Sequence, residues 1–179
     1  MKTTLVALIL TAWSLPAVAE ETAANPPTDA EIAHIVVTAN AIDIAAGKSA
    51  KSKTKDNEVK KFADQMVTDH TAVNQQAADL AKKLGVKPKD NPTSKSLNAD
   101  AKKSAADLKK LKGKDFDKAY VDREVAYHEA VLGAIDQVLI PNAKNEELKA
   151  LIEKVRPAID AHLQHAKSIQ SKLSSGGHS

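Results

Sequence analysis

Cysteine is absent from this 179-residue chain, and aromatic residues make up only 3% of it. The lack of cysteine excludes a disulfide framework, a cysteine nucleophile and lipid attachment at a cysteine. No glycine-rich phosphate loop and no serine nucleophile motif occurs in the sequence. What remains is rich in Ala, Lys, Leu, Asp and Val, a composition that favours helices over a sheet.

A strong excess of one charge is also missing. The 26 Lys and Arg residues nearly balance the 23 Asp and Glu residues, so the formal net charge is +3. Charges of both signs alternate along the chain, which does not favour nucleic acid as a partner. Lysines cluster in residues 48–61 and 102–118, where acids separate them. We interpret both runs as solvated faces; weak contact with anionic envelope polymers or a membrane surface is the alternative.

The first nineteen residues have the order of a secretory signal peptide. Lys2 supplies a positive charge, residues 5–15 are mostly apolar, and Ala-Val-Ala at 17–19 forms a small-x-small cleavage site. The apolar run is too short for a permanent membrane helix, which needs about 20 residues. We therefore expect cleavage after Ala19, a periplasmic or secreted protein, and no transmembrane segment in the mature chain.

Beyond the predicted signal, apolar residues recur at helical spacing. Residues 20–28 are expected to be a disordered lead-in, with a capping box formed by Thr28 and Glu31. Gly85 is expected to end one helix, and Pro157 to kink another. The pattern predicts a helical domain over 29–173 and a flexible tail over 174–179. Its helices are expected at about 29–53, 57–84, 94–112, 115–140 and 145–173.

Helix lengths and connections predict the topology. Four helices are roughly 25 residues long, and short turns near 54–57 and 141–145 make each neighbouring pair antiparallel. The segment between the second and third long helices can cross the bundle end to end. The fold class is therefore all-α: a ferritin-like four-helix bundle with a short crossover helix between helices 2 and 3.

Three segments together resemble a bacterial family of exported, putative outer-membrane proteins of unknown function. They are EVKKFADQMVTDH (58–70), GKDFDKAYVDREVAYHEAVL (113–132) and RPAIDAHLQHAKSI (156–169). The resemblance implies a ferritin-like bundle but no settled biochemistry. Ferritin-type oxidase centres need Glu-x-x-His pairs. The residues three before His70, His128 and His162 are Val, Val and Ile, so an oxidase is not favoured and the protein is not expected to be an enzyme.

His70, His128 and His162 stand on the predicted inner stripes, each near the middle of its helix. The midpoints of helices with aligned ends meet at one level whichever way the chain runs, so the three imidazoles are expected to converge. Asp43 reaches the same level from the first helix. Three histidines and a carboxylate are ligands for Zn²⁺, Cu²⁺ or Fe²⁺. Glu124, one turn before His128, is a further ligand or an orienting partner.

Two interpretations of this histidine layer stay open. In the first, an exported helical-bundle protein binds a transition metal through the layer. In the second, the layer only specifies helix packing in a structural or envelope-stress interaction module. Met66, one turn before His70, is expected to fill a gap in the core rather than bind Cu(I). His165 is expected at the rim, and His34 and His178 at the surface. No protein partner is indicated.

Overall fold

The computed structural model describes residues 25–175, and every regular element in that range is helical. The signal peptide predicted over 1–19 lies outside the described residues. So do positions 20–24 of the predicted lead-in and positions 176–179 of the predicted tail, including His178.

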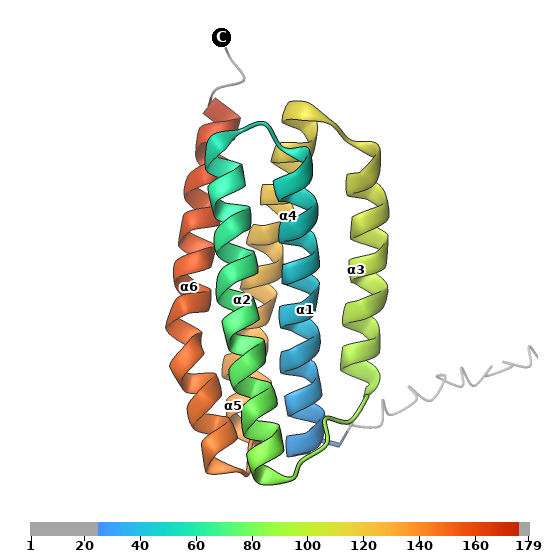
Figure 1. Ribbon diagram of the computed structural model, residues 1–179, viewed down its shortest axis with the longest axis vertical. Helices are drawn as coiled ribbons and strands as arrows, with labels where there is room; N and C mark the ends of the chain where they lie inside the picture. The colour runs from blue at the N-terminus through green and yellow to red at the C-terminus, as the bar shows by residue number, and fades with distance from the viewer. Residues whose placement is uncertain (1–24, 176–179) are drawn as a thin grey trace, which may run out of the picture.

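The elements follow one another as α1 (Asp29–Lys53), α2 (Asn57–Leu84), α3 (Pro92–Lys110), α4 (Gly113–Ala134), the π-helical turn η1 (Ile135–Leu139), α5 (Ile140–Asn142) and α6 (Glu146–Ser175). The long helices α1, α2, α4 and α6 lie side by side (Figure 1). α1 and α6 run in one direction, and α2 and α4 in the other. α3 packs outside α1 and α4 and returns the chain to the end at which α2 began.

The helix ends follow from local chemistry that the sequence displays. Thr28 and Glu31 form the predicted capping box at the start of α1. The Asp56 carboxylate accepts the N–H groups of the first turn of α2. Gly85 ends α2 with φ +64°, in the left-handed region that favours glycine. The boundaries predicted for the first two helices are confirmed.

The prediction was wrong in detail around α3. This helix spans 92–110 instead of 94–112, because Asn91 caps it and Pro92 occupies its first turn. Gly113 was expected to end the short helix, but it begins α4 with φ +54°. Ser174 and Ser175, which were predicted to begin the tail, belong to α6, because this helix continues through Ser175.

The third long helix was expected to end at about residue 140, directly before Pro141. Instead, residues 135–139 form the π-helical turn η1, and the chain stays helical to Asn142. The N–H of Ile140 bonds to the carbonyl of Ile135, five residues back. A π-helical turn widens the helix locally, and such turns are frequent at functional sites. η1 borders an apolar cavity that reaches His70 and His128.

α1 also departs from the expectation that no segment after the signal is apolar enough to span a membrane. By length and composition, α1 would be able to cross one. Its apolar stretch is 44% buried in the protein, where Ile32 and Ile35 pack in the core. A core helix passes the same test, so this is weak support for a membrane role.

The core consists of two apolar clusters at opposite ends of the long helices. One surrounds Phe62, Phe116 and Tyr120 and includes Met66; the other surrounds Ile32 and Ile152. Met66 therefore contributes to apolar packing, as expected. Between the clusters lies a buried polar layer, made by Asn40, Asp43, His70, Glu124, His128 and His162. Because charged and polar groups are costly to bury without partners, this layer is the candidate functional site.

Candidate metal centre

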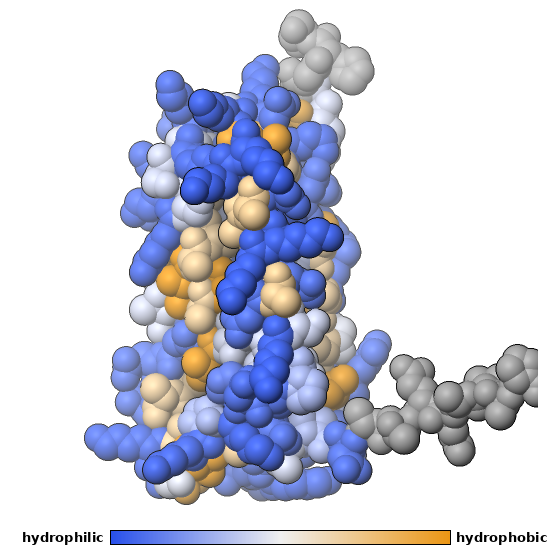
Figure 2. All heavy atoms as spheres, turned by 90° about the vertical axis from the view of Figure 1, so that its right-hand side faces the viewer, coloured by the Kyte–Doolittle hydropathy of each residue, from blue (hydrophilic) through white to orange (hydrophobic). Residues whose placement is uncertain are grey.

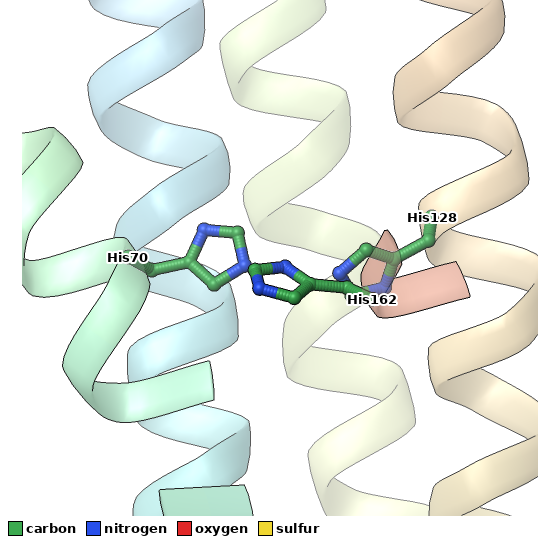
Figure 3. Close-up of side chains that lie close together, drawn as sticks. All are labelled: His70, His128 and His162. Atoms are coloured by element: carbon green, nitrogen blue, oxygen red, sulfur yellow. The ribbon is translucent and has the colours of Figure 1, made fainter. Parts of the chain in front are cut away.

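The three histidines come from three different helices and converge, as predicted. His70 lies on α2, His128 on α4 and His162 on α6, and each is at most 3% exposed. Their rings face one another in the bundle interior (Figure 3), with centroids 5.3, 5.6 and 5.8 Å apart. One ring nitrogen of each lies within 4.8 Å of one from each of the others.

His70 has a fixed tautomer. The amide of Asn40 donates through Nδ2 to the carbonyl of Val36 at 2.8 Å, so its Oδ1 is the atom turned toward His70. His70 Nδ1 lies 2.6 Å from that oxygen and must therefore carry the proton. The other nitrogen, Nε2, is buried and has no hydrogen-bond partner among residues 25–175. It lies 3.1 Å from Asp43 Oδ2, but not in hydrogen-bonding geometry.

His128 and His162 repeat this division of roles. His128 Nδ1 donates to the backbone carbonyl of Glu124 at 2.9 Å, and His162 Nε2 donates to Asp69 Oδ2 at 2.9 Å. The remaining nitrogens, His128 Nε2 and His162 Nδ1, are buried and unpartnered within the described part of the chain. His128 Nε2 lies 3.6 Å from the same Asp43 oxygen, Oδ2, that His70 approaches.

The pKa values of the two buried acids next to the histidines are shifted in opposite directions. Burial raises the pKa of Asp43, but the neighbouring His70, His128 and Arg123 outweigh burial and hold that pKa below its ordinary value. Burial, and then the Asp43 carboxylate, raises the pKa of Glu124 well above its ordinary range. Of the two acids, Asp43 therefore favours the ionised form and Glu124 the neutral form. Arg123 donates to both, to Asp43 Oδ1 at 3.0 Å and to Glu124 Oε1.

The imidazoles adjoining Asp43 are neutral near pH 7. Burial lowers the pKa of His70 to about 4, although the Asp43 carboxylate opposes that effect. Burial also lowers the pKa of His128. A neutral imidazole whose one nitrogen holds the proton offers a lone pair on the other. The layer thus offers bare nitrogens from three helices, on rings whose centroids are 5.3–5.8 Å apart.

Residues 14–169 match the family described as a domain of unknown function, DUF4142. The chain belongs to this family. The DUF4142 match includes α1 to α5 and most of α6, and therefore every residue of the histidine layer. No curated protein and no solved structure matches the chain.

In this DUF4142 chain, the contact between His70 and Asp43 brings two acceptors together. The bare Nε2 of a neutral imidazole and a carboxylate oxygen repel each other unless a proton or a cation lies between them. Two ligand atoms on a tetrahedral ion, each about 2.0–2.1 Å from it, are about 3.3 Å apart. The observed 3.1 Å separation matches that spacing. The arrangement therefore suits a small cation held between these atoms.

The other residues singled out in the sequence occupy different environments in the structure. Glu124 is fully buried, and it holds His128 through its backbone carbonyl while its carboxyl group bonds to Arg123. It can also form a second group with Asp43 and His128, whose ligand atoms lie within 4.8 Å of one another. His165 is exposed, with Nδ1 3.1 Å from Gln65 Oε1, as the rim placement predicted. His34 is half-buried rather than solvent-exposed.

Three residues of the centre were missed by the sequence analysis: Asn40, Asp69 and Arg123. Asn40 lies three residues before Asp43 on the same face, so a buried polar residue on an otherwise apolar stripe was the available signal. Asp69 and Arg123 directly precede His70 and Glu124. Neither carries a spacing signal, because each acts on a group from another helix: Asp69 bonds to His162 on α6, and Arg123 to Asp43 on α1.

Proposed function

We propose that this protein binds one divalent transition-metal ion through His70 Nε2, His128 Nε2 and His162 Nδ1, with Asp43 Oδ2 as the fourth ligand. The supporting observation is that each imidazole has one nitrogen held by an acceptor and the other bare and buried. Metal-ligating histidines have this arrangement, in which an outer partner fixes the tautomer and the ring orientation.

The ligand set favours Zn²⁺, Cu²⁺ or Fe²⁺ over Mg²⁺ or Ca²⁺, because imidazole suits the former and oxygen ligands suit the latter. Glu124 stays outside these four ligands and orients His128. The resulting role is metal binding in a non-enzymatic protein. The absence of Glu-x-x-His pairs from the sequence supports this distinction from ferritin-type oxidases.

The proposal includes a setting and a fold. We infer that the protein is exported, since residues 1–19 have the order of a signal peptide. The up-down-down-up course of α1, α2, α4 and α6, with α3 as the crossover, supports the ferritin-like arrangement. Intact-mass analysis of protein recovered from the periplasm or medium should give a mature N-terminus at Glu20. A mass that retains residues 1–19 would contradict export by cleavage.

Metal content and affinity test the proposed centre directly. Untagged protein is purified from its native compartment, its metals are counted, and Co²⁺ is titrated as a spectroscopic probe. We expect one ion per chain and Co²⁺ absorption typical of nitrogen and oxygen ligands. His70→Ala, His128→Ala and His162→Ala should each abolish stoichiometric binding.

His165→Ala is the matched control, because this exposed histidine lies one turn from His162 on the same helix. It should bind the ion as the parent protein does. If all four variants and the parent fail to bind, the metal proposal is wrong. Large losses of stability in the three buried variants would then support a layer that only specifies packing.

A further inference from the structure

An apolar cavity begins at the histidine layer and continues toward the α5 end of the molecule. Its volume is about 140 Å³, and it lies among α1, α2, α3, α4, η1 and α6. Four polar side chains border it at the layer: Asn40, Asp43, His70 and His128. Thr93 and Tyr127 also border it, and the remaining lining residues are apolar. The cavity is therefore polar where it meets the layer and apolar along its length.

The polar end of the cavity carries two imidazole nitrogens that could bind a ligand. The bare nitrogens of His70 and His128 are both buried and unpartnered among the described residues, and both side chains line the cavity. His162 does not line it. A molecule in the cavity would thus approach the centre from the side of His70, His128 and Asp43.

The apolar end is shaped by the π-helical turn. Ile135 and Leu139, the first and last residues of η1, both line the cavity and are nearly fully buried. An ordinary helical turn would place these side chains differently, because a π-helical turn contains an additional residue. The irregular turn and the cavity therefore coincide.

The lining of the cavity includes surface residues on α3 and α4. Thr93 on α3 and Ala130 on α4 are the lining residues that are exposed. From the side that carries α3, apolar side chains are visible between hydrophilic ones (Figure 2). Entry between α3 and α4 would not require the long helices to separate.

We propose that the cavity binds a small, mostly apolar molecule of about six to eight carbon atoms, of the phenol class, whose oxygen becomes a further ligand of the bound metal ion. This inference rests on the proposed metal centre. An apolar protein cavity of about 150 Å³ accommodates benzene, which sets the size of the ring.

The donor follows from the charges at the polar end. Asp43 is the one carboxylate that lines this end of the cavity, and its Oδ1 already accepts a hydrogen bond from Arg123. The charge of a divalent ion is thus not neutralised by the layer, and a phenol that releases its proton to the solvent and binds as phenolate would reduce that imbalance. A four-coordinate ion of this type can accept a fifth ligand.

Phenol binding to the Co²⁺-loaded protein tests the proposal, with benzene as the analogue that lacks a donor. The Co²⁺ stoichiometry is measured first on the same sample. We expect phenol to bind and to change the Co²⁺ absorption, and to bind the metal-free protein at least tenfold more weakly. Benzene should leave the Co²⁺ absorption unchanged.

Ala134→Leu fills the cavity from α4, and Val155→Phe fills it from α6, since both residues line it without contributing a ligand. Each should reduce phenol affinity at least tenfold while Co²⁺ binding is retained. Ala126→Leu is the control, because Ala126 is exposed on α4 and does not line the cavity.

The outcomes separate the two proposals. Stoichiometric Co²⁺ without any response to phenol overturns the cavity inference and leaves the metal centre in place. Phenol binding that leaves the Co²⁺ absorption unchanged, or that Ala134→Leu and Val155→Phe do not weaken, also overturns it. If Co²⁺ does not bind, the metal centre fails first and the inference fails with it.

Discussion

Asp69→Asn is the most informative single substitution, because Asp69 touches no predicted ligand atom. Its carboxylate accepts the hydrogen bond from His162 Nε2 at 2.9 Å and so leaves Nδ1 as the bare nitrogen of that ring. Asparagine keeps an acceptor oxygen of the same size but removes the charge. The substitution therefore weakens the orientation and the basicity of His162 while the three imidazoles remain.

The size of the effect follows from the hydrogen bond and its exposure. A bond to a charged group contributes about 1.5–3 kcal/mol and a neutral one about 0.5–1.5 kcal/mol. The Asp69 side chain is 42% exposed, so solvent screens its charge. The free-energy difference between the charged and the neutral hydrogen bond is therefore expected to be small. A loss of about 1.4 kcal/mol is tenfold in affinity. Changes in such outer partners typically reduce metal affinity 10- to 100-fold.

Competition with a chromophoric chelator at fixed pH measures this change. Asp64→Asn is the matched control, because Asp64 lies on the same helix, is also half-exposed, and pairs with Lys51 instead of a histidine. We expect about tenfold weaker Zn²⁺ binding for Asp69→Asn and no change for Asp64→Asn. Equal affinities for both variants would refute the idea that Asp69 orients a metal ligand.

Three further outcomes follow from the same geometry. Because the pKa of His70 falls from 6.5 to about 4 on folding, the unfolded chain binds the extra proton between these values. The free energy of unfolding of the metal-free protein should then decrease as pH falls from 6.5 to 4, by up to about 3 kcal/mol, and denaturant titrations at several pH values would detect this. In a double-mutant cycle, the loss of unfolding free energy in the double variant should differ by more than about 0.5 kcal/mol from the sum of the losses for His70→Ala and His128→Ala. Additive losses would mean that the two rings do not interact. Gly47→Ala should lower stability by about 1–3 kcal/mol in thermal unfolding, because the new Cβ would lie 2.9 Å from the Ala63 carbonyl oxygen, whereas Gly133→Ala meets nothing within 4 Å and should be neutral or stabilising.

The helices and the level of the histidines could be predicted because both depend on local information. Caps such as Thr28 and Gly85 fix where helices begin and end, and the ends fix the midpoints. Rise per residue is constant in a helix, so residues at equal depth meet without knowledge of the packing angles. This is why His70, His128 and Asp43 converged as expected.

The parts that could not be predicted depend on contacts between distant helices. Nothing local distinguishes Asp69, whose partner His162 is on α6, from the solvated acids around it. The charge states of Asp43 and Glu124 depend on burial and on Arg123, which reaches across to α1. The π-helical turn was not predicted, because Pro141 has no backbone N–H and was expected to end the α-helix before it.

α3 has a consequence for how quickly the interior exchanges with solvent. Ser94 is its one buried side chain, so α3 gains little from packing compared with the long helices. Segments with few buried contacts detach in brief sub-global openings that need far less free energy than complete unfolding. Arg123 lines the grooves on both sides of α3, where α3 faces α1 and α4. Each such opening would therefore expose the arginine next to Asp43 while α1, α2, α4 and α6 stay packed. Amide hydrogens of α3 should accordingly exchange first, and the lifetime of an ion in the protein would be governed by the opening frequency of this one helix.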